Sequence, residues 1–348
     1  MSTLRAAVLG ASGMVGQRFC EMLSDHPYFD LPALYGSEKG GERTVSDVLT
    51  IPDSRISEEL LSARIMPFDL EAVASEKYDA VFSALPTDVA AASEVELMRR
   101  GCRLFTNASP NRMRSDVPLV VPEVNHEHLS MVEGKNGFIV ANGNCSSIGL
   151  AMGLKPIAAL GLRSVVVTTM QALSGAGYPG VPSLDSSANI VPFIDSEEEK
   201  MSQEIPKMLG SLEDGSVRRS SVEVSATCTR VPVRDGHMES VTVRVGRETD
   251  AAQIAGLFNS FTSLPQRLSL PSAPARPVIC RHEKNRPQPL LDVNAGSPER
   301  ARGMAATVGR IRVEGERVRF IILTHNTIRG AAGGSVLNAE ILHSKGVI

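Results

Sequence analysis

The sequence lacks tryptophan, and aromatic residues make up only 4% of its 348 residues. The flat side chains on which single-stranded nucleic acids stack are therefore scarce. An excess of positive charge is also missing, because 36 basic residues are offset by 39 acidic ones, for a net charge of -3. Such a chain has no field that would attract nucleic acid or an anionic membrane. These shortages argue against both classes of partner and favour a protein that acts on small molecules.

Cysteines are few and far apart, and long hydrophobic runs are absent. The five cysteines form no C-x-x-C pair, which indicates free thiols in a reducing compartment rather than a disulfide framework. The cysteines and the seven histidines never cluster at zinc spacing, so we expect no metal site. No run of 18 apolar residues occurs, and residues 1–9 leave no room for a signal peptide. We therefore expect a cytoplasmic protein.

The length of the chain suits two domains. In its first part, short apolar runs alternate with helical stretches, which predicts an α/β fold with a parallel sheet. After Gly161 the runs are rich in Val and Thr, which is typical of a mixed sheet in an α+β fold. The proline-rich residues 263–289 suggest an extended connection or a surface insertion. We expect a first domain at residues 1–145, a second at residues 146–327, and a helix within residues 328–348 that returns to the first domain.

A glycine-rich turn follows the first predicted strand. Gly10, Gly13 and Gly16 recur at intervals of three before a predicted helix, a variant of the dinucleotide-binding fingerprint. Small residues there let the backbone N–H groups of the helix N-terminus approach a pyrophosphate. A tight turn without a ligand is the alternative. We expect a Rossmann-type domain, and the expected cofactor contacts at this turn are Gly10, Ser12, Gly13, Met14 and Val15.

The end of the second predicted strand bears on the choice of cofactor. An NAD enzyme usually has an acidic residue there that binds the ribose hydroxyls. In this chain the strand leads into Ser37, Glu38 and Lys39. Ser37 and Lys39 suit the 2′-phosphate of NADP, so we expect NADP(H), while Glu38 leaves NAD open as the alternative.

Cys145 stands at a predicted strand-to-helix junction, between Asn144 and Ser146. A helix N-terminus stabilises a thiolate and lowers its pKa, as a cysteine nucleophile requires. Such a nucleophile also needs a proton donor and acceptor. His237, in an Asp-Gly-His turn between two predicted strands, is the strongest candidate. We expect Cys145 to react and His237 to assist it.

Several separated motifs agree on one family. They are Gly10-x-x-Gly13-x-x-Gly16, Asn144-Cys145-Ser146, Gln171-x-x-Ser174-Gly175-Ala176-Gly177, Glu197-Glu198-Glu199-Lys200 and Arg230-Val231-Pro232-Val233-x-x-x-His237. In this order the set resembles the aspartate-semialdehyde dehydrogenase family, in its archaeal and fungal branch, over most of the chain. The resemblance implies NADPH-dependent reduction of L-aspartyl 4-phosphate to L-aspartate 4-semialdehyde through a thioester, in the biosynthesis of lysine, threonine and methionine.

The resemblance also implies roles for individual residues. Cys145 is the nucleophile, His237 the acid–base catalyst, and Gln171 orients the intermediate. The implied substrate contacts are Arg230 for the carboxylate, Glu197 for the ammonium, and Arg112 and Lys200 for the phosphate. Further implied cofactor contacts are Ser174, Gly175 and Asn326. The family also implies a second domain that is both catalytic and dimerising, and a homodimer or homotetramer.

One residue departs from the pattern of the family. The family usually has proline between the two asparagines before the nucleophile, whereas this chain has Gly143. Glycine loosens the backbone where proline fixes it, so a changed substrate stays open. The alternatives are reduction of malonyl-CoA, succinyl-CoA or another acyl phosphate by the same route, and a non-catalytic dinucleotide-binding protein. Arg230 and the acidic segment at Glu197 favour a substrate that bears both a carboxylate and an ammonium group.

Overall fold

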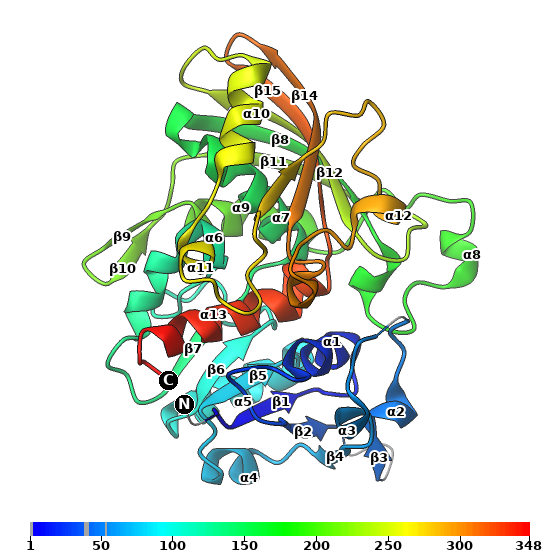
Figure 1. Ribbon diagram of the computed structural model, residues 1–348, viewed down its shortest axis with the longest axis vertical. Helices are drawn as coiled ribbons and strands as arrows, with labels where there is room; N and C mark the ends of the chain where they lie inside the picture. The colour runs from blue at the N-terminus through cyan, green and yellow to red at the C-terminus, as the bar shows by residue number, and fades with distance from the viewer. Residues whose placement is uncertain (1–2, 38–41, 53) are drawn as a thin grey trace.

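The structure is a computed structural model that describes residues 3–37, 42–52 and 54–348. Two sheets divide it, one built from the first part of the chain and one from the second part, which lies above the first in Figure 1. The predicted order of a parallel α/β sheet followed by a mixed sheet is confirmed. Among the helices that the structure describes, none is long and apolar enough to cross a membrane.

The first sheet has the strand order β3-β4-β2-β1-β5-β6-β7, and all neighbours are parallel except β3 and β4. Its strands are β1 (Ala6–Leu9), β2 (Ala33–Gly36), β3 (Arg43–Thr44), β4 (Arg64–Pro67), β5 (Ala80–Ser83), β6 (Arg103–Thr106) and β7 (Phe138–Ala141). Its helices are α1 (Met14–Leu23), α2 (Val45–Val48), α3 (Glu58–Leu61), α4 (Leu70–Ser75), α5 (Thr87–Arg99), α6 (Pro122–Asn125) and η1 (His126–Val132). β1, β5 and β7 are buried at every residue, because helices cover both faces of a parallel sheet.

Alternate residues of these strands pack against different helices. Leu9 and Val81 belong to the same apolar cluster as Leu97 of α5. Val8 and Phe82 point the other way and cluster with side chains of α1 and of α13 (Gly333–Ser344). α13 follows the second sheet in the chain, yet it contacts β5, β6 and β7 of the first sheet. The domain limits at residues 145 and 327 stay a prediction.

The second sheet has the order β11-β8-β12-β15-β14-β13 and mixes parallel with antiparallel neighbours. Its strands are β8 (Leu162–Gln171), β11 (Glu223–Arg230), β12 (His237–Val245), β13 (Val278–Cys280), β14 (Ala306–Glu314) and β15 (Arg317–Thr324). The other elements of this part are α7 (Cys145–Leu154), η2 (Lys155–Leu160), η3 (Leu173–Ala176), α8 (Ser183–Ser186), α9 (Glu197–Met208), β9 (Ser211–Glu213), β10 (Ser216–Arg218), α10 (Ala251–Ser260), α11 (Leu264–Arg267), α12 (Pro289–Asp292), η4 (Glu299–Ala301) and η5 (Ile328–Ala332).

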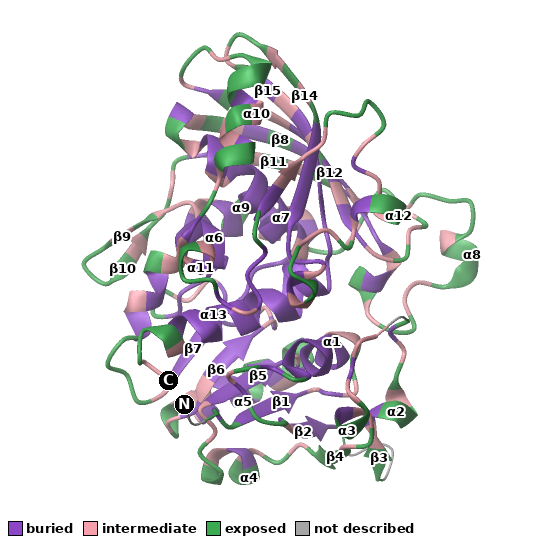
Figure 2. Ribbon diagram, in the orientation of Figure 1, coloured by how far each residue is buried: buried purple, intermediate pink, exposed green. Residues whose placement is uncertain are grey.

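One face of the second sheet packs against α7. Along β12, buried residues alternate with more exposed ones, as expected for a strand with one covered face. α7 itself contacts β12, β14 and β15 on one side and α9 and η5 elsewhere. It is therefore buried along its length after its first residue, as Figure 2 shows.

The segment from residue 263 to 289 is more ordered than its prolines suggest. It contains α11 and β13, and β13 pairs in parallel with β14 at the edge of the second sheet. The expectation of an extended connection or a surface insertion did not include these two elements. The prolines around β13 argued against a strand in the sequence. An edge strand nevertheless accepts proline close to it.

Candidate active site

Cys145 is the first residue of α7, directly after the turn that follows β7. The residue before it, Asn144, caps the helix, because its side-chain oxygen accepts hydrogen bonds from the N–H groups of Ser146 (3.0 Å) and Ser147 (3.3 Å). These bonds fix the first turn of the helix, with the sulfur at its N-terminus. The predicted junction of strand and helix is thus present at Cys145.

His237 reaches this sulfur from the second sheet, as the first residue of β12. Its Nε2 lies 3.1 Å from Cys145 Sγ. Its Nδ1 accepts a hydrogen bond of 3.1 Å from the backbone N–H of Ala172, the residue after β8. The two predicted catalytic residues, 92 positions apart in the chain, are therefore in direct contact.

Glu197, at the start of α9, lies beside the same turn. The Asn144 side-chain amide donates to both of its carboxylate oxygens, at 2.8 and 2.9 Å. Gln171 Nε2 donates to it at 3.3 Å, and Lys200 Nζ at 3.1 Å. The structure thus brings Glu197, Lys200 and Gln171 together next to the nucleophile, and a single carboxylate connects them.

Gln171 and Arg230 end the neighbouring parallel strands β8 and β11, where they pair in register. Arg230 is buried, and its Nη1 donates a hydrogen bond of 2.7 Å to the carbonyl oxygen of Ala172. A Cβ at Gly175 would lie 2.8 Å from Arg230 Nη1 and 2.9 Å from His237 Cε1. Glycine at this position therefore lets η3 pack directly over both side chains.

Arg112 is connected to the cysteine turn through a residue that the sequence analysis missed. Its Nη1 donates to one oxygen of Glu204 at 3.0 Å, and the other oxygen of Glu204 accepts from the backbone N–H of Asn144 at 2.7 Å. Arg112 Nη2 also donates to the carbonyl oxygen of Asn107 at 2.7 Å. Glu204 lies in α9, 92 residues from Arg112, so no local pattern in the sequence signals this contact.

The packing around residue 143 explains why this chain has glycine where the family pattern has proline. A Cβ there would lie 2.1 Å from Met208 Cε and 3.2 Å from a carboxylate oxygen of Glu204. α9 therefore packs against this turn through Met208. The Met208 side chain fills the space that a side chain at position 143 would need.

The pKa of Cys145, the predicted nucleophile, differs from the expectation. Burial and the negative charge of Glu197 raise the pKa of Cys145 to about 12, and this outweighs the opposing effects of Arg112, Arg230 and the N–H of Ser146. Burial, with smaller contributions from Arg230 and His325, lowers the pKa of His237 to about 3. The predicted lowering of the thiol pKa at the helix N-terminus is therefore wrong, because burial and Glu197 outweigh it.

The glycine turn forms a cradle with the geometry that a dinucleotide requires. Gly10 has φ +80°, and a Cβ there would lie 2.5 Å from the carbonyl oxygen of Ala84. A Cβ at Gly16 would lie 2.1 Å from the carbonyl oxygen of Gly10. Glycine is thus needed at both positions, because α1 begins close to the end of β1.

A cavity of about 400 Å³ opens over this turn, at the carboxyl ends of β1, β2 and β5. Its walls include Gly10, Ser12, Gly13, Gly36, Ser37, Phe68, Ala84, Leu85, Pro86 and Val89. Apolar walls beside exposed glycine backbone suit an adenine ring and its phosphates. Met14 lines a neighbouring cavity together with Ser174, and Val15 lies in the first turn of α1. Lys39, the other predicted contact of the 2′-phosphate, lies outside the described residues.

Asn326 links two loops of the site. Its Nδ2 donates to Ser174 Oγ at 2.8 Å, and its Oδ1 accepts from the backbone N–H of Gly236 at 2.8 Å. Gly330, farther along the same segment, lies against Cys145, since a Cβ there would be 2.9 Å from Cys145 Cβ. The segment after β15 therefore adjoins both the nucleophile and the turn that carries His237.

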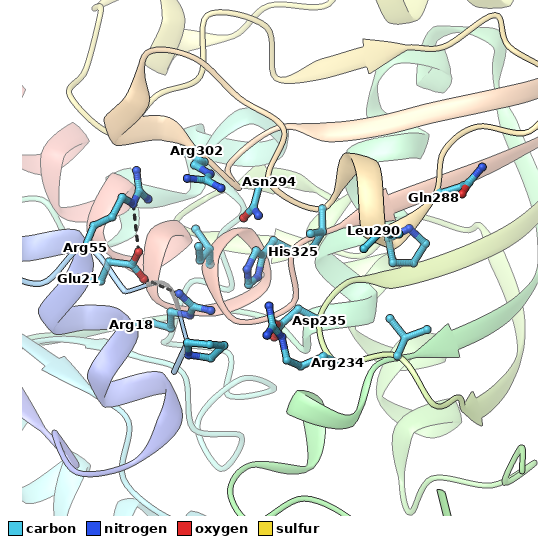
Figure 3. Close-up of a pocket in the computed structure, with 15 residues that line it drawn as sticks. Arg18, Glu21, Arg55, Arg234, Asp235, Gln288, Leu290, Asn294, Arg302 and His325 are labelled. Carbon is cyan, nitrogen blue, oxygen red and sulfur yellow. Dashed lines mark hydrogen bonds and ion pairs between the residues drawn. The ribbon is translucent and has the colours of Figure 1, made fainter. Parts of the chain in front are cut away.

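A second cavity, of about 560 Å³, lies beside the site (Figure 3). Charged side chains from α1 and from the turn before His237 line it, among them Arg18, Glu21, Arg234 and Asp235. Glu21 forms ion pairs with Arg18 and Arg55, drawn as dashed lines in Figure 3.

The described residues hold no group of three or more His, Cys, Asp or Glu side chains that could bind a metal ion.

The close packing at Gly16 predicts a clear effect on stability. Gly16→Ala should lower the free energy of unfolding by about 1–3 kcal/mol, because the new methyl group meets backbone atoms that cannot move aside. Chemical denaturation measures this change. Gly256→Ala in α10 is the matched control, since its Cβ meets nothing within 4 Å, and it should leave the protein as stable or more so. Equal stability of the two variants would contradict the geometry of the turn.

Known proteins match this chain over nearly its whole length, and all of these matches are to related enzymes. Residues 5–132 match a family described as "Semialdehyde dehydrogenase, NAD binding domain", and residues 154–329 match "Semialdehyde dehydrogenase, dimerisation domain". The chain is 46% identical to a protein of Archaeoglobus fulgidus named "Aspartate-semialdehyde dehydrogenase", over 98% of each chain. It is 36% identical to a protein of Metallosphaera sedula named "Malonyl CoA reductase (NADP)", over 99% of this chain and 98% of that one.

A solved structure of a related enzyme is also similar to this chain in three dimensions. The crystal structure of aspartate semialdehyde dehydrogenase with NADP from Candida albicans is similar with a TM-score of 0.89 and 35% identity, over 100% of both chains. Sequence and structure thus agree with the motifs that surround Cys145 and the glycine turn. This chain belongs to the aspartate-semialdehyde dehydrogenase family, which confirms the resemblance seen in its sequence.

Proposed function

We propose that the protein reduces L-aspartyl 4-phosphate to L-aspartate 4-semialdehyde with NADPH, through a thioester on Cys145. The contact of 3.1 Å between Cys145 Sγ and His237 Nε2 carries this proposal. A thiol that is held against an imidazole at a helix N-terminus is the arrangement with which an enzyme forms and breaks a thioester. Names of relatives support the same activity, which belongs to the biosynthesis of lysine, threonine and methionine.

Two buried charges of opposite sign suit an amino acid as the substrate. Arg230 presents a planar fork that binds a carboxylate with two parallel hydrogen bonds. Glu197 binds the ammonium group, with Gln171 and Asn144 holding its carboxylate in place. Malonyl-CoA has no ammonium group for Glu197 to bind, so this pair favours the amino acid.

Arg112 and Lys200 bind the phosphate of the substrate in this proposal. Both are already oriented by carboxylates, Arg112 by Glu204 and Lys200 by Glu197. Attack of the sulfur on the acyl carbon releases this phosphate, and Gln171 orients the thioester that remains. The positive charges stabilise the leaving group as its negative charge grows.

The residues of the first domain fit NADP(H). When bound there, the cofactor supplies a hydride to the carbon of the thioester. Backbone N–H groups at the start of α1 hold the pyrophosphate, through the turn formed by Gly10, Ser12, Gly13, Met14 and Val15. Ser37 and Lys39 would bind the 2′-phosphate, and Ser174, Gly175 and Asn326 would hold the nicotinamide end. The NADP-bound relative of 35% identity supports this assignment.

Assay of the reverse reaction tests the proposal directly. We expect the purified protein to raise nicotinamide absorbance when it receives L-aspartate 4-semialdehyde, inorganic phosphate and NADP, and to respond more weakly to NAD. Omission of phosphate should abolish the steady rate. Turnover of malonyl-CoA or succinyl-CoA with NADPH, and none of the semialdehyde, would assign the protein to the acyl-CoA branch instead. No turnover of any of these compounds would favour a non-catalytic role.

The second half of the chain matches a dimerisation domain, and we infer a homodimer or a homotetramer. The open face of the second sheet supports this inference, because β8 and β11 expose alternate residues on it. Free cysteines and the absence of a disulfide among them support a cytoplasmic location.

A further inference from the structure

Lys207 is a buried lysine near the end of α9, and it is 4% exposed. Its Nζ donates three hydrogen bonds to backbone carbonyl oxygens, those of Arg112 and Arg114 at 2.7 Å and that of Val117 at 2.9 Å. Burial, with the positive charge of Arg219, lowers the pKa of Lys207 to about 8, so the ammonium form still prevails at neutral pH. An ammonium group has three N–H donors and no acceptor. Because all three donors are used within the protein, Lys207 has none left for a substrate.

The three carbonyl oxygens belong to one short stretch of chain after β6, residues 112–117. Just before this stretch, Asn111 Nδ2 donates a hydrogen bond of 2.8 Å to the buried carboxylate of Glu94 in α5. Hydrogen bonds from a charged donor are stronger than those between neutral groups, and three of them converge here on six residues. Lys207 therefore fixes the path of the main chain at Arg112.

Glu204, three residues before Lys207 in α9, holds the side chain of the same arginine. Arg112 Nη1 donates to one oxygen of its carboxylate at 3.0 Å, and the other oxygen accepts from the backbone N–H of Asn144 at 2.7 Å. Residues three apart in a helix are neighbours on its surface. One face of α9 thus holds both the side chain and the backbone of Arg112, and the carboxylate of Glu204 connects this arginine to the turn before Cys145.

Arg112 keeps one donor available in this arrangement. Its Nη2 donates to the carbonyl oxygen of Asn107, but among the described residues its buried Nε–H has no hydrogen-bond partner. Burial and Glu197 raise the pKa of Cys145, and Arg112 is the first of the cations that oppose them, so its guanidinium group lies close to the sulfur. A free donor on a cation beside the nucleophile suits a phosphate group bonded to the acyl carbon.

We propose that Lys207 is a positioning residue for the phosphate of the substrate. It fixes the backbone of Arg112 while Glu204 fixes the side chain, so that α9 sets the place of the phosphate relative to Cys145. This inference rests on the proposed function. Lys207 acts on the step that releases phosphate, or in reverse on the attack of phosphate on the thioester, and leaves hydride transfer unaffected. Glu204 acts on both steps, because it also holds the backbone N–H of Asn144.

Oxidation of aspartate semialdehyde at neutral pH separates the two steps. A single turnover with NADP and without phosphate reports hydride transfer, and the KM for inorganic phosphate in steady state reports the attack on the thioester. We expect Lys207→Met to raise this KM by on the order of tenfold or more, because misplacement of a binding group weakens its contacts, and to keep the single-turnover rate within about twofold of the wild type. Glu204→Gln should impair both measurements.

Lys345→Met is the matched control, since it removes a lysine that pairs with Glu133 at the surface, and it should change neither measurement. An unchanged KM for phosphate in Lys207→Met, or an equal loss in both steps, would overturn the inference. Should Lys207→Met fail to fold, Lys207→Gln carries the same test with a smaller increase, because its amide retains two of the three donors.

A double variant tests whether Lys207 acts through Arg112. Arg112→Ala should raise the KM for phosphate by itself, and Lys207→Met should add little to it, because two residues that act through one contact have non-additive effects. The same factor for Lys207→Met with and without Arg112 would show that the lysine acts by another route and would overturn the inference. Failure of the proposed function would look different, since the wild type would then not oxidise the semialdehyde at all.

Discussion

Cys145→Ser is expected to lower kcat for oxidation of aspartate semialdehyde by on the order of 10³-fold or more, as loss of a catalytic nucleophile does in other enzymes. A hydroxyl at the start of α7 is a weaker nucleophile than sulfur, and an ester accepts a hydride less readily than a thioester. The rise in nicotinamide absorbance gives the rate. Mass spectrometry of the wild-type protein mixed with aspartyl phosphate should show an acyl group on the peptide that contains Cys145.

Cys280→Ser provides the matched control for this variant. Cys280 is also a free and partly exposed cysteine, but it lies in β13 at the far edge of the second sheet. Its replacement should leave kcat close to that of the wild type. Turnover that survives in Cys145→Ser, or that disappears in Cys280→Ser, would place the chemistry on another residue.

His237→Ala should reduce kcat by about 10²–10⁴-fold, the range that removal of an assisting proton donor commonly produces. The loss follows from the contact of 3.1 Å with the sulfur, which no other described side chain reproduces in the structure. His237→Gln should fall between alanine and the wild type, because the amide retains a donor. His282→Ala, at an exposed position, is the control and should behave as the wild type does. Wild-type turnover in His237→Ala would remove this residue from the reaction.

Much of the fold could be predicted from the sequence, because its signals are local. The apolar spacing from Met14 to Leu23 gave the bounds of α1 that the structure has, and the alternation of strands and helices indicated the parallel sheet. β3 and β13 were missed, since strands of two and three residues carry no periodicity of their own. Such segments become strands because the backbone groups of a neighbouring strand form hydrogen bonds with them.

The site could be predicted only where the type and spacing of residues indicate a chemical role. Cys145 and His237 were predicted as catalytic residues from their turns and from the ordered motifs, and the structure places them in contact. The roles of Glu204 and Ala172 were not foreseen, because one acts from mid-helix and the other through its backbone. The ionisation of Cys145 was also missed, since burial and the charge of Glu197 exist only after folding.

The position of α13 has a consequence for how the chain folds during synthesis. Val336 and Leu337 belong to the apolar cluster that covers one side of β5 and β6, so the first domain is completed by residues that follow the second sheet in the chain. A ribosome synthesises these residues only after the second sheet, and until then that apolar side stays open to solvent and to other nascent chains. Maturation of the nucleotide-binding half is thereby coupled to synthesis of the second half, and termination before α13 should yield an aggregation-prone fragment rather than a stable half-enzyme.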